Sequence, residues 1–447
     1  MHKFIPNTNE DKNKMLEAIG VESIEELFAE IPEEFRLGRD LDLPDQMAEM
    51  ELRKHMRDLG KKNQSTDDLT CFLGAGAYDH YIPSVVKNLA SRGEFYTAYT
   101  PYQPEISQGT LRVIFEYQTM IAELTGLYAS NASLYDGQTA VVEGAIMAVA
   151  KMRKRETVLV SESVHPETRK VLRTYLEHQD IKVIEVGLDN GVTDINDLKE
   201  KMSKDVATVI VQSPNFFGII EDIEPLVEVA HEQKSIFMQS VDPMSLGILK
   251  SPGEMGVDIA VGDAQCFGNG LNFGGPYLGF IATTDKLFRK LPGRIVGETT
   301  DEEGKRAYVL TLQAREQHIR RERATSNICS NQALNALMAT IYLSTVGKQG
   351  LKEIALQCIN KTNYAIEKIT ALEGYELLFD QPVFKEFAIK GTSDVQKIKD
   401  KLLEEGILGG YSLEAEYDAF KNSALYAVTE KRTKEEIDKL AEVLEVI

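Results

Sequence analysis

Apolar runs and helix-like segments alternate along the middle of the chain, between residues 157 and 261. The short runs are rich in β-branched residues, which favours buried strands, and the segments between them repeat their apolar residues at the spacing of an amphipathic helix. Repeated βα units predict an α/β fold: a mostly parallel sheet with helices on both faces. The expected strands are 157–161, 181–186, 207–212, 236–240 and 257–261, and the expected helices are 166–178, 195–202 and 225–233.

The pattern changes towards both ends of the chain, which predicts three domains. Residues 1–70 form a charged N-terminal helical arm that packs on the body or on a partner, with helices expected at 9–19, 23–29 and 43–61. Residues 71–345 form the large α/β domain. Residues 346–447 form a small α+β domain with an antiparallel sheet. Its expected helices are 350–372, 395–405 and 434–446, and its expected strands are 386–390 and 424–429.

The stretch from 257 to 276 is the most informative part of the large domain. An apolar strand is followed by a turn, a loop with four glycines and a second apolar run at 277–282. Many enzymes that use pyridoxal phosphate (PLP) present the lysine that binds the cofactor in such a setting. Here no lysine occurs between Lys250 and Lys286, and Gln265 stands where the lysine is expected.

Polar residues follow the expected strands, at the edge where parallel sheets bind ligands. His165, Asp242 and Gln265 follow three of these strands, and residues 213–215 follow a fourth. His165 could stack on a flat ring, and Asp242 could pair with a pyridine nitrogen. Both residues also precede a proline, so each could instead cap a helix.

A run dense in tyrosine, threonine and glutamine lies at 94–109, and its prolines forbid a regular helix. Polar aromatic side chains on such a segment favour the wall of a pocket or an interface, and a plain surface loop is the alternative. The candidates in this run are Tyr96, Tyr99, Thr100, Tyr102 and Gln103.

Two segments could bind an anion at the start of a helix. Residues 136–139 precede an apolar helix, where either a phosphate cradle or an ordinary N-cap by Asp136 fits the sequence. Residues 325–327 lie just ahead of a helix expected at 331–343. They follow an arginine-rich stretch, 315–323, which could serve a pocket, a partner protein or acidic groups of the chain itself.

Composition narrows the classes of partner. The chain has 447 residues, a net charge of -20 and a pI of about 5.0, which argues against nucleic acid or an anionic membrane as a partner. Its four cysteines form no C-x-x-C pair, so neither a metal site nor a disulfide framework is expected. The amino terminus lacks an apolar signal core and no run is long enough to span a membrane, so we expect a cytoplasmic protein.

The chain resembles a known family along nearly its whole length. The segments 96–109, 262–268, 273–276 and 315–329 are similar to those of the P-protein of the glycine cleavage system, the glycine decarboxylase. That family has the type I PLP fold and occurs as one fused chain or as two subunits. This length and the missing lysine resemble the α subunit, which corresponds to the amino-terminal half of fused forms.

The resemblance implies what the chain binds and does. It would join a PLP-bearing β subunit, in an α2β2 complex, to decarboxylate glycine and pass the aminomethyl group to the lipoyl arm of the H-protein. The partner would hold PLP covalently, and this chain alone would be inactive. Thr325, Ser326 and Asn327 would contact the phosphate of that PLP. The expected pocket lining adds His318 and Arg320 to the tyrosine-rich run, while His165, Asp242 and Gln265 would form a vestigial site.

Two alternatives stay open from the sequence. The chain could be an inert scaffold that only stabilises the PLP-bearing subunit. It could also be an independent enzyme that uses a lysine outside the expected position.

Overall fold

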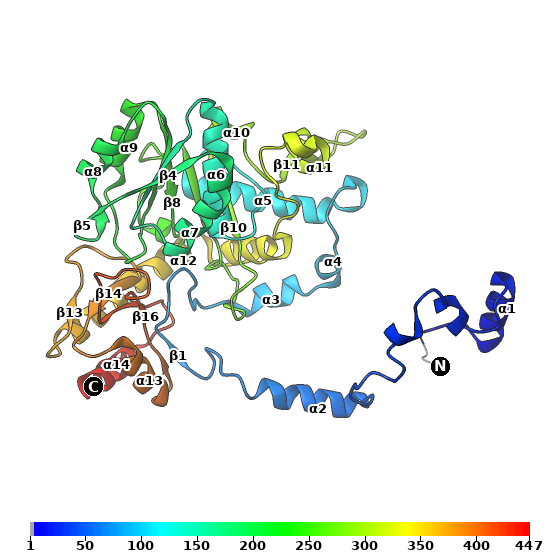
Figure 1. Cartoon of the computed structure of the whole chain (residues 1–447). Helices are drawn as coiled ribbons and strands as arrows, with labels where there is room; N and C mark the ends of the chain where they lie inside the picture. The colour runs from blue at the N-terminus through cyan, green and yellow to red at the C-terminus, as the bar shows by residue number, and fades with distance from the viewer. Residues whose placement is uncertain (1–3) are drawn as a thin grey trace. The chain divides into compact units, whose positions relative to one another are not determined.

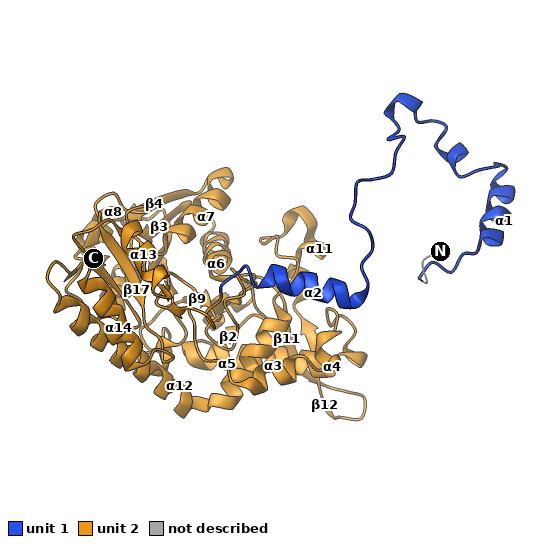
Figure 2. Cartoon of the chain, turned by 90° about the horizontal axis from the view of Figure 1, so that it is seen from below, with its two compact units in different colours: residues 1–64 blue, residues 65–447 orange. Residues whose placement is uncertain are grey.

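The computed structural model describes residues 4–447, so the first three residues of the expected arm lie outside it. The chain divides into two compact units, one ending at Gln64 and the other running from Ser65 to Ile447 (Figure 2). The division of the second unit at 345/346 stays a prediction. None of the helices described between residues 4 and 447 is long and apolar enough to cross a membrane.

The first unit consists of short helices without a buried core. Helix α1 spans Asn9–Ile19, as expected, and a capping box between Thr8 and Asp11 begins it. The helix expected at 43–61 is shorter at its amino end, where the Glu51 carboxylate accepts from the backbone N–H of Ala48 and caps it. That helix, α2, covers Glu49–Gly60. The segment 23–29 forms only the 3₁₀ turn Glu25–Phe28 (η1), and a second turn is η2, Glu33–Phe35.

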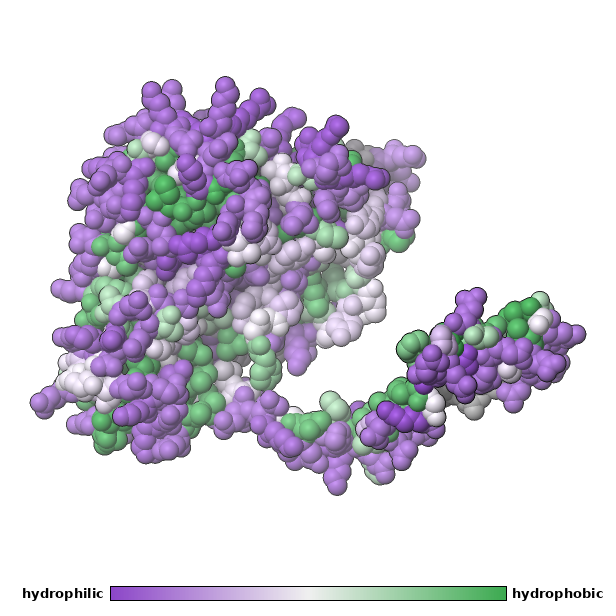
Figure 3. All heavy atoms as spheres, viewed as in Figure 1, coloured by the Kyte–Doolittle hydropathy of each residue, from purple (hydrophilic) through white to green (hydrophobic). Residues whose placement is uncertain are grey.

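Hydrophobic side chains are exposed along this first unit and alternate with charged ones (Figure 3). None of its helices contains a buried residue. The unit therefore lacks the packed core that stabilises an independent domain.

A seven-stranded sheet forms the centre of the second unit (Figure 1). Its order is β2-β10-β9-β8-β7-β3-β4; the five strands from β9 to β4 run parallel, and β10 is antiparallel to both of its neighbours. The mostly parallel sheet expected from the sequence is thus confirmed. The strands are β2 (Ala129–Ser130), β3 (Thr157–Ser161), β4 (Lys182–Val186), β7 (Val206–Gln212), β8 (Ile236–Ser240), β9 (Ile259–Asp263) and β10 (Gly279–Thr283).

Helices cover both faces of this sheet because successive strand residues point to opposite sides. Val158 and Val160 pack with helices α6 and α7, whereas Leu159 between them packs with α8 and α9 on the other face. Helices α5 and α12 cover the part of that second face nearer β10. These helices are α5 (Gln108–Thr125), α6 (Gly137–Met152), α7 (Pro166–Leu176), α8 (Ile195–Lys201), α9 (Ile223–Glu232) and α12 (Ala333–Thr370).

The C-terminal part has its own antiparallel sheet, of order β13-β14-β17-β16. The two helices expected at 331–343 and 350–372 form the single element α12, which leaves helical geometry only at Gly347, where φ is +60°. The strands are β13 (Glu376–Leu377), β14 (Glu386–Lys390), β16 (Tyr411–Ser412) and β17 (Ser423–Ala427), and the helices are α13 (Val395–Glu404) and α14 (Lys434–Glu445).

Shorter elements complete the second unit. The strand β1 (Thr70–Cys71) pairs in parallel with β15 (Ile407–Leu408), so the chain's entry into this unit lies beside its C-terminal part. The others are α3 (Ser84–Ala90), α4 (Gly93–Tyr96), η3 (Pro104–Ile106), η4 (Glu177–Gln179), β5 (Leu188–Asp189), β6 (Val192–Thr193), η5 (Ser245–Gly247), α10 (Asp285–Phe288), β11 (Ile295–Thr300), β12 (Arg306–Thr311), η6 (Gln313–Arg315), α11 (Gln317–Arg320) and η7 (Arg321–Arg323).

The loop after β7 touches the start of β14 so closely that only glycine fits at position 218. Gly218 has φ of +83°, and a Cβ there would lie 1.9 Å from the backbone oxygen of Glu386. Gly256 has a similar φ of +79°, but its Cβ would meet nothing nearer than Val227 at 3.5 Å. A side chain at Gly256 would meet only backbone strain, whereas one at Gly218 would meet the same strain and also a clash with Glu386.

Gly218→Ala is therefore expected to cost clearly more stability than Gly256→Ala. The control variant bears only the strain of a left-handed alanine, about 1–2 kcal/mol, whereas Gly218→Ala must also push β14 away from the loop. Urea unfolding of both variants measures the difference. Equal losses in the two variants would show that the contact at Glu386 is not tight.

Candidate active-site cavity and its neighbours

A cavity of about 600 Å³ lies at the carboxyl ends of the parallel strands. His165, Asp242 and Gln265 all border it, so three of the strand-end residues singled out in the sequence come together. Residues 213–215 do not border this cavity. Asn215 instead donates, at 2.9 Å, to the carboxylate of Glu221, and both side chains are buried. Parallel strands end at one edge of the sheet, which explains why residues far apart in sequence meet there.

Gln265 is buried and its amide is fully engaged. Its Oε1 accepts from the backbone N–H of Tyr78 at 2.9 Å, and its Nε2 donates to the carbonyls of Tyr78 at 3.0 Å and Asn269 at 2.7 Å. The side chain at the expected lysine position therefore braces the glycine-rich segment before α3.

Asp242 is paired with a lysine from the C-terminal part of the chain. Its Oδ2 lies 2.7 Å from Nζ of Lys385, and its Oδ1 accepts from the backbone N–H of Met244. Burial acts to lower the pKa of Lys385, but the Asp242 carboxylate more than offsets this and holds that pKa above its ordinary value. The carboxylate that could have met a pyridine nitrogen meets an ammonium group of its own chain. Asp242 caps no helix, because η5 begins only at Ser245.

Lys385 is fixed from several sides. Its Nζ donates to Nε2 of His80 at 3.1 Å and lies 3.5 Å from the centre of the Tyr78 ring. The next residue, Glu386, accepts from the hydroxyl of Tyr78 at 2.7 Å and from the N–H of Ala75 at 2.6 Å. The sequence analysis missed these three residues, Tyr78, Lys385 and Glu386. The only hint of Lys385 and Glu386 in the sequence is that two charged residues stand together at the start of an apolar strand.

His165 caps helix α7, the alternative that the sequence had left open. Its Nδ1 accepts from the N–H of Glu167 at 3.2 Å, and its Nε2 donates to the carbonyl of Ala75 at 2.9 Å. Burial lowers the pKa of this imidazole, which keeps the ring neutral at pH 7. The ring packs edge-on against Phe216, with 4.8 Å between the ring centres.

Carboxylates occupy the start of helix α6. Asp136 is its N-cap and accepts from the N–H of Thr139 at 2.8 Å, so the capping alternative holds here. Asp263 accepts from the N–H of Gly137 at 3.0 Å, and burial raises the pKa of Asp263 to about 6. A phosphate at this helix start would meet two carboxylates that already use its donors.

The residues of this cavity do not fit bound PLP. None of the described residues that line it is a lysine, and Gln265 stands at the position expected for one. Asp242, the carboxylate suited to the pyridine nitrogen, is paired with Lys385. The backbone N–H groups at the start of α6 that could bind a phosphate donate to Asp136 and Asp263 instead.

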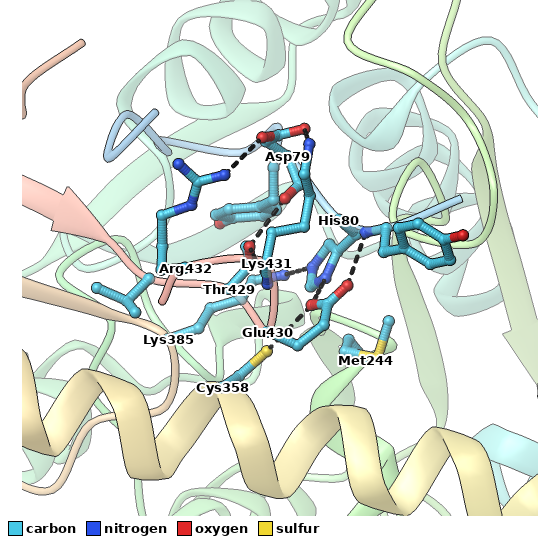
Figure 4. A network of polar contacts seen from close by, with 12 residues as sticks. Asp79, His80, Met244, Cys358, Lys385, Thr429, Glu430, Lys431 and Arg432 are labelled. Carbon is cyan, nitrogen blue, oxygen red and sulfur yellow. Dashed lines mark hydrogen bonds and ion pairs between the residues drawn. The ribbon is translucent and has the colours of Figure 1, made fainter. Parts of the chain in front are cut away.

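A network of charges joins the segment before α3 to the segment after β17 (Figure 4). Asp79 pairs with Lys431 at 2.7 Å and with Arg432 at 3.3 Å. His80 donates to Glu430 at 2.6 Å. Burial alone would raise the pKa of Glu430, but its close contact with His80 and the hydrogen bond from the backbone N–H of Tyr81 hold that pKa at about 2. The network holds the wall of the cavity against the C-terminal part.

Cys358 adds a thiol to this network, so His80, Cys358 and Glu430 place three ligand-type atoms within 4.8 Å of one another. The thiol lies 3.7 Å from the same Glu430 oxygen that accepts from His80. The ammonium of Lys385, 3.1 Å from His80, would repel a cation. The cluster is satisfied by its own hydrogen bonds.

The tyrosine-rich run lies away from this cavity. Tyr96, Tyr99 and Gln103 are exposed, and Thr100 is half-buried. Tyr102 is anchored by Arg294, whose Nη2 donates to the tyrosine hydroxyl at 2.9 Å. These side chains do not line the 600 Å³ cavity, so the pocket-wall role expected for them stays a prediction.

The segment 325–327 does not open a helix, which corrects the sequence analysis. Helix α12 begins at Ala333 with Gln332 as its N-cap, several residues further on. Thr325 and Asn327 are exposed and Ser326 is half-buried. Both His318 and Arg320 are also exposed; Nδ1 of His318 lies 3.6 Å from the Glu316 carboxylate.

A model of the family described as "Glycine cleavage system P-protein" matches residues 2–444. The chain belongs to the glycine cleavage system P-protein family. A relative from Carboxydothermus hydrogenoformans is 56% identical over 442 residues, covering 99% of both chains, and one from Bacillus licheniformis is 54% identical, covering 98% of both. Both are named probable glycine dehydrogenase (decarboxylating) subunit 1.

Solved structures agree with this assignment. A crystal structure of glycine decarboxylase (P-protein) in inhibitor-bound form is 43% identical to the chain, covers 100% of both chains and has a TM-score of 0.90. A sphingosine-1-phosphate lyase of Burkholderia pseudomallei has a TM-score of 0.66 at 14% identity over 93% of both chains, which shows the fold alone. The P-protein chain therefore has the type I PLP fold expected from its sequence.

Removal of the lysine from the buried pair should be strongly destabilising. Lys385→Met leaves the largely buried carboxylate of Asp242 without its counter-ion, which is expected to cost about 3–5 kcal/mol. The double variant Lys385→Met/Asp242→Asn should recover most of this loss. Urea unfolding checks both, with Lys250→Met as control, because Lys250 pairs with Glu224 on the surface. A Lys385→Met variant as stable as this control would contradict the buried pair.

Glu386 should make stability depend on pH. Burial raises its pKa from the ordinary 4.5 to about 7. Between these values the folded chain keeps a proton that the unfolded chain releases, so the free energy of unfolding falls as the pH rises. In Glu386→Gln this fall should be shallower by up to about 1.4 kcal/mol per pH unit. Unfolding curves measured across pH 4.5–7 give the slope of the free energy of unfolding against pH. The same slope in Glu386→Gln and in the unaltered chain would show that Glu386 does not carry this proton.

Proposed function

We propose that this chain is the subunit without the cofactor lysine in a two-subunit glycine decarboxylase. With a second, PLP-bearing subunit it would decarboxylate glycine and transfer the aminomethyl group to the lipoyl arm of the H-protein. The observation that carries this proposal is the cavity at the strand ends, where Gln265 stands at the position expected for the lysine and Lys385 pairs with Asp242, the carboxylate suited to the pyridine nitrogen. A chain of this family with such a cavity needs its cofactor from another subunit.

PLP, covalently held by the second subunit, would supply the electron sink that the decarboxylation of glycine needs. This chain's part is to bind and position. The hydroxyl of Thr325 is exposed on an irregular segment, which suits a donor to a phosphate outside the chain. Ser326 and Asn327 add further donors beside it. This assignment follows the family resemblance of the segment.

The tyrosine-rich run suits a wall of the shared site. Tyr96, Tyr99 and Tyr102 expose 71%, 84% and 48% of their surface, which is large for aromatic side chains. With Thr100 and Gln103 they offer hydroxyl and amide groups to a polar substrate. His318 and Arg320 are exposed as well and complete the proposed lining. We place these residues at the contact with the second subunit, in an α2β2 complex of the cytoplasm.

A test compares Thr325→Val with Thr300→Val in the complex reconstituted with the second subunit. Both threonines are exposed, but only Thr325 is proposed to reach the phosphate. Loss of a hydrogen bond to a charged group is worth about 1.5–3 kcal/mol, so PLP should dissociate roughly 10–100-fold more readily from the Thr325→Val complex. PLP retention and glycine–bicarbonate exchange measure this, and Tyr99→Phe in the same assay tests the tyrosine-rich run.

The alternative is an inert scaffold that only stabilises the second subunit. It is the better description if the Thr325→Val and Tyr99→Phe complexes assemble, keep PLP and exchange at the rate of the unaltered complex. An independent enzyme would instead show aldimine absorbance in this chain purified alone, with a lysine labelled after borohydride reduction.

A further inference from the structure

A buried arginine joins the tyrosine-rich run to the segment that follows residues 325–327. Arg294 is 5% exposed and lies just before strand β11. Its Nη2 donates to the hydroxyl of Tyr102 at 2.9 Å and to the carbonyl of Cys329 at 3.0 Å. Its Nη1 donates to Oδ1 of Asn331 at 3.1 Å. One guanidinium therefore holds two segments that are far apart in the sequence.

Tyr102 is the point at which the tyrosine-rich run is attached to the rest of the second unit. Between residues 94 and 103 of the described chain, no other side chain forms a hydrogen bond with a distant element. The guanidinium carbon of Arg294 also lies 5.3 Å from the centre of the Tyr102 ring, so a cation–π attraction adds to the hydrogen bond. The next attachment is at Gln108, whose amide pairs with the backbone of Tyr308 at 2.9 Å.

The segment that leads into helix α12 is held by Arg294 and by the residues before α6. The N–H of Cys329 donates to the hydroxyl of Tyr135 at 3.1 Å, and Nδ2 of Asn331 donates to the carbonyl of Ala132 at 3.3 Å. The carbonyl of Arg294 in turn accepts from the N–H of Ala132 at 2.9 Å. Arg294 and this segment are thus bound to the same stretch of backbone.

The backbone before Arg294 is fixed as well. Arg315 donates through Nη2 to the carbonyl of Gly293 at 2.9 Å and through Nε to the carbonyl of Leu312 at 3.0 Å. Arg315 also lines a small cavity that the buried carboxyl of Glu143 on α6 borders. Because its backbone is held in this way, the guanidinium of Arg294 offers both segments a fixed point.

Arg294 has no carboxylate partner in the described chain from residue 4 to 447. It forms no ion pair there, and its Nε has no hydrogen-bond partner. Arginine is rarely buried without an acidic partner, so its use here calls for another reason. The planar guanidinium carries two terminal nitrogens in a rigid fork, which can reach acceptors on two separate segments at once. The contacts of Arg294 use this span.

We propose that Arg294 is a positioning residue of the shared active site, which sets the tyrosine-rich run and the segment 325–331 in one arrangement. The inference rests on the proposed function, because that function places both segments at the cofactor of the second subunit. Arg294 acts through these segments and not on the substrate. Its loss is therefore expected to weaken glycine binding and PLP retention together.

Hydrogen–deuterium exchange of the chain alone tests whether Arg294 holds the two segments. Arg294→Met removes every donor of the side chain and is expected to speed amide exchange in residues 97–103 and 328–331 by about tenfold or more. The buried strand β3 should keep its exchange rate. The matched control is Arg306→Met, since Arg306 also lies 5.3 Å from the centre of a tyrosine ring but pairs with Glu298 at the surface.

Arg294→Lys separates the span of the guanidinium from its charge. A lysine keeps the positive charge, but its single ammonium group is a compact point that can hold one of the two segments at most. At least one segment is therefore expected to exchange as fast as in Arg294→Met. Full protection of both segments by the lysine would contradict the role of the fork.

Kinetics of the complex reconstituted with the second subunit test the role of Arg294 in the shared site. Arg294→Met is expected to raise the KM for glycine and the rate of PLP dissociation by about tenfold each. A chain that is merely less stable would lower the fraction of active complex, and hence kcat, without a change in KM. Adding Tyr102→Phe to Arg294→Met should change KM little further, because the hydrogen bond between them is already lost.

The outcomes distinguish this inference from the proposed function. Unchanged exchange in both segments of Arg294→Met, or an equal rise in β3, would show that Arg294 does not hold them. Looser segments with unchanged KM and PLP retention would remove Arg294 from the shared site, while an impaired Thr325→Val complex would leave the proposed function standing. If Thr325→Val and Tyr99→Phe are silent as well, the proposed function fails, and the positioning role fails with it.

Discussion

The ion pair between Asp242 and Lys385 is the interaction on which the cavity depends. Two charges are removed from water there, which is favourable only when their geometry is good and their other hydrogen bonds are satisfied. Both conditions hold: Asp242 also accepts from a backbone N–H, and Lys385 also meets His80 and the face of Tyr78. The pair therefore fixes the end of β8 against the start of β14. The wall between them, including Gln265, is fixed with it.

This pairing within the chain distinguishes the cavity from the cofactor site of a PLP enzyme with the same fold. The sheet edge, the glycine loop and the helix start of a PLP enzyme are all present, but each group that would hold a cofactor already has a partner within the chain. Asp136 and Asp263 use the donors of α6, and the amide of Gln265 supports the segment before α3. The fold keeps its shape with these groups engaged inside the chain, which accords with relatives that are named subunit 1 of glycine dehydrogenase.

The spacing of apolar residues along the sequence predicted many of the helices and strands, but it did not predict which side chains of distant elements pair. The strands 157–161 and 386–390 were located to the residue, because strands buried on both faces give continuous apolar runs. The site at the strand ends followed from the sheet topology. The pairing of Lys385 with Asp242 leaves no local periodicity, so only the three-dimensional structure reveals it. The same holds for Tyr102, whose partner Arg294 lies 192 residues away in the sequence.

The cavity beside Asp242 and the cavity beside Glu143 differ in how their buried carboxyl groups are paired within the chain. Asp242 is matched from within the chain, by the ammonium of Lys385 and the backbone N–H of Met244. Around Glu143 a buried carboxyl and a fixed guanidinium face one space without meeting. A buried polar group without a partner costs about 1–3 kcal/mol, and burial lessens this cost at Glu143 by raising its pKa to about 7, which favours the neutral carboxyl.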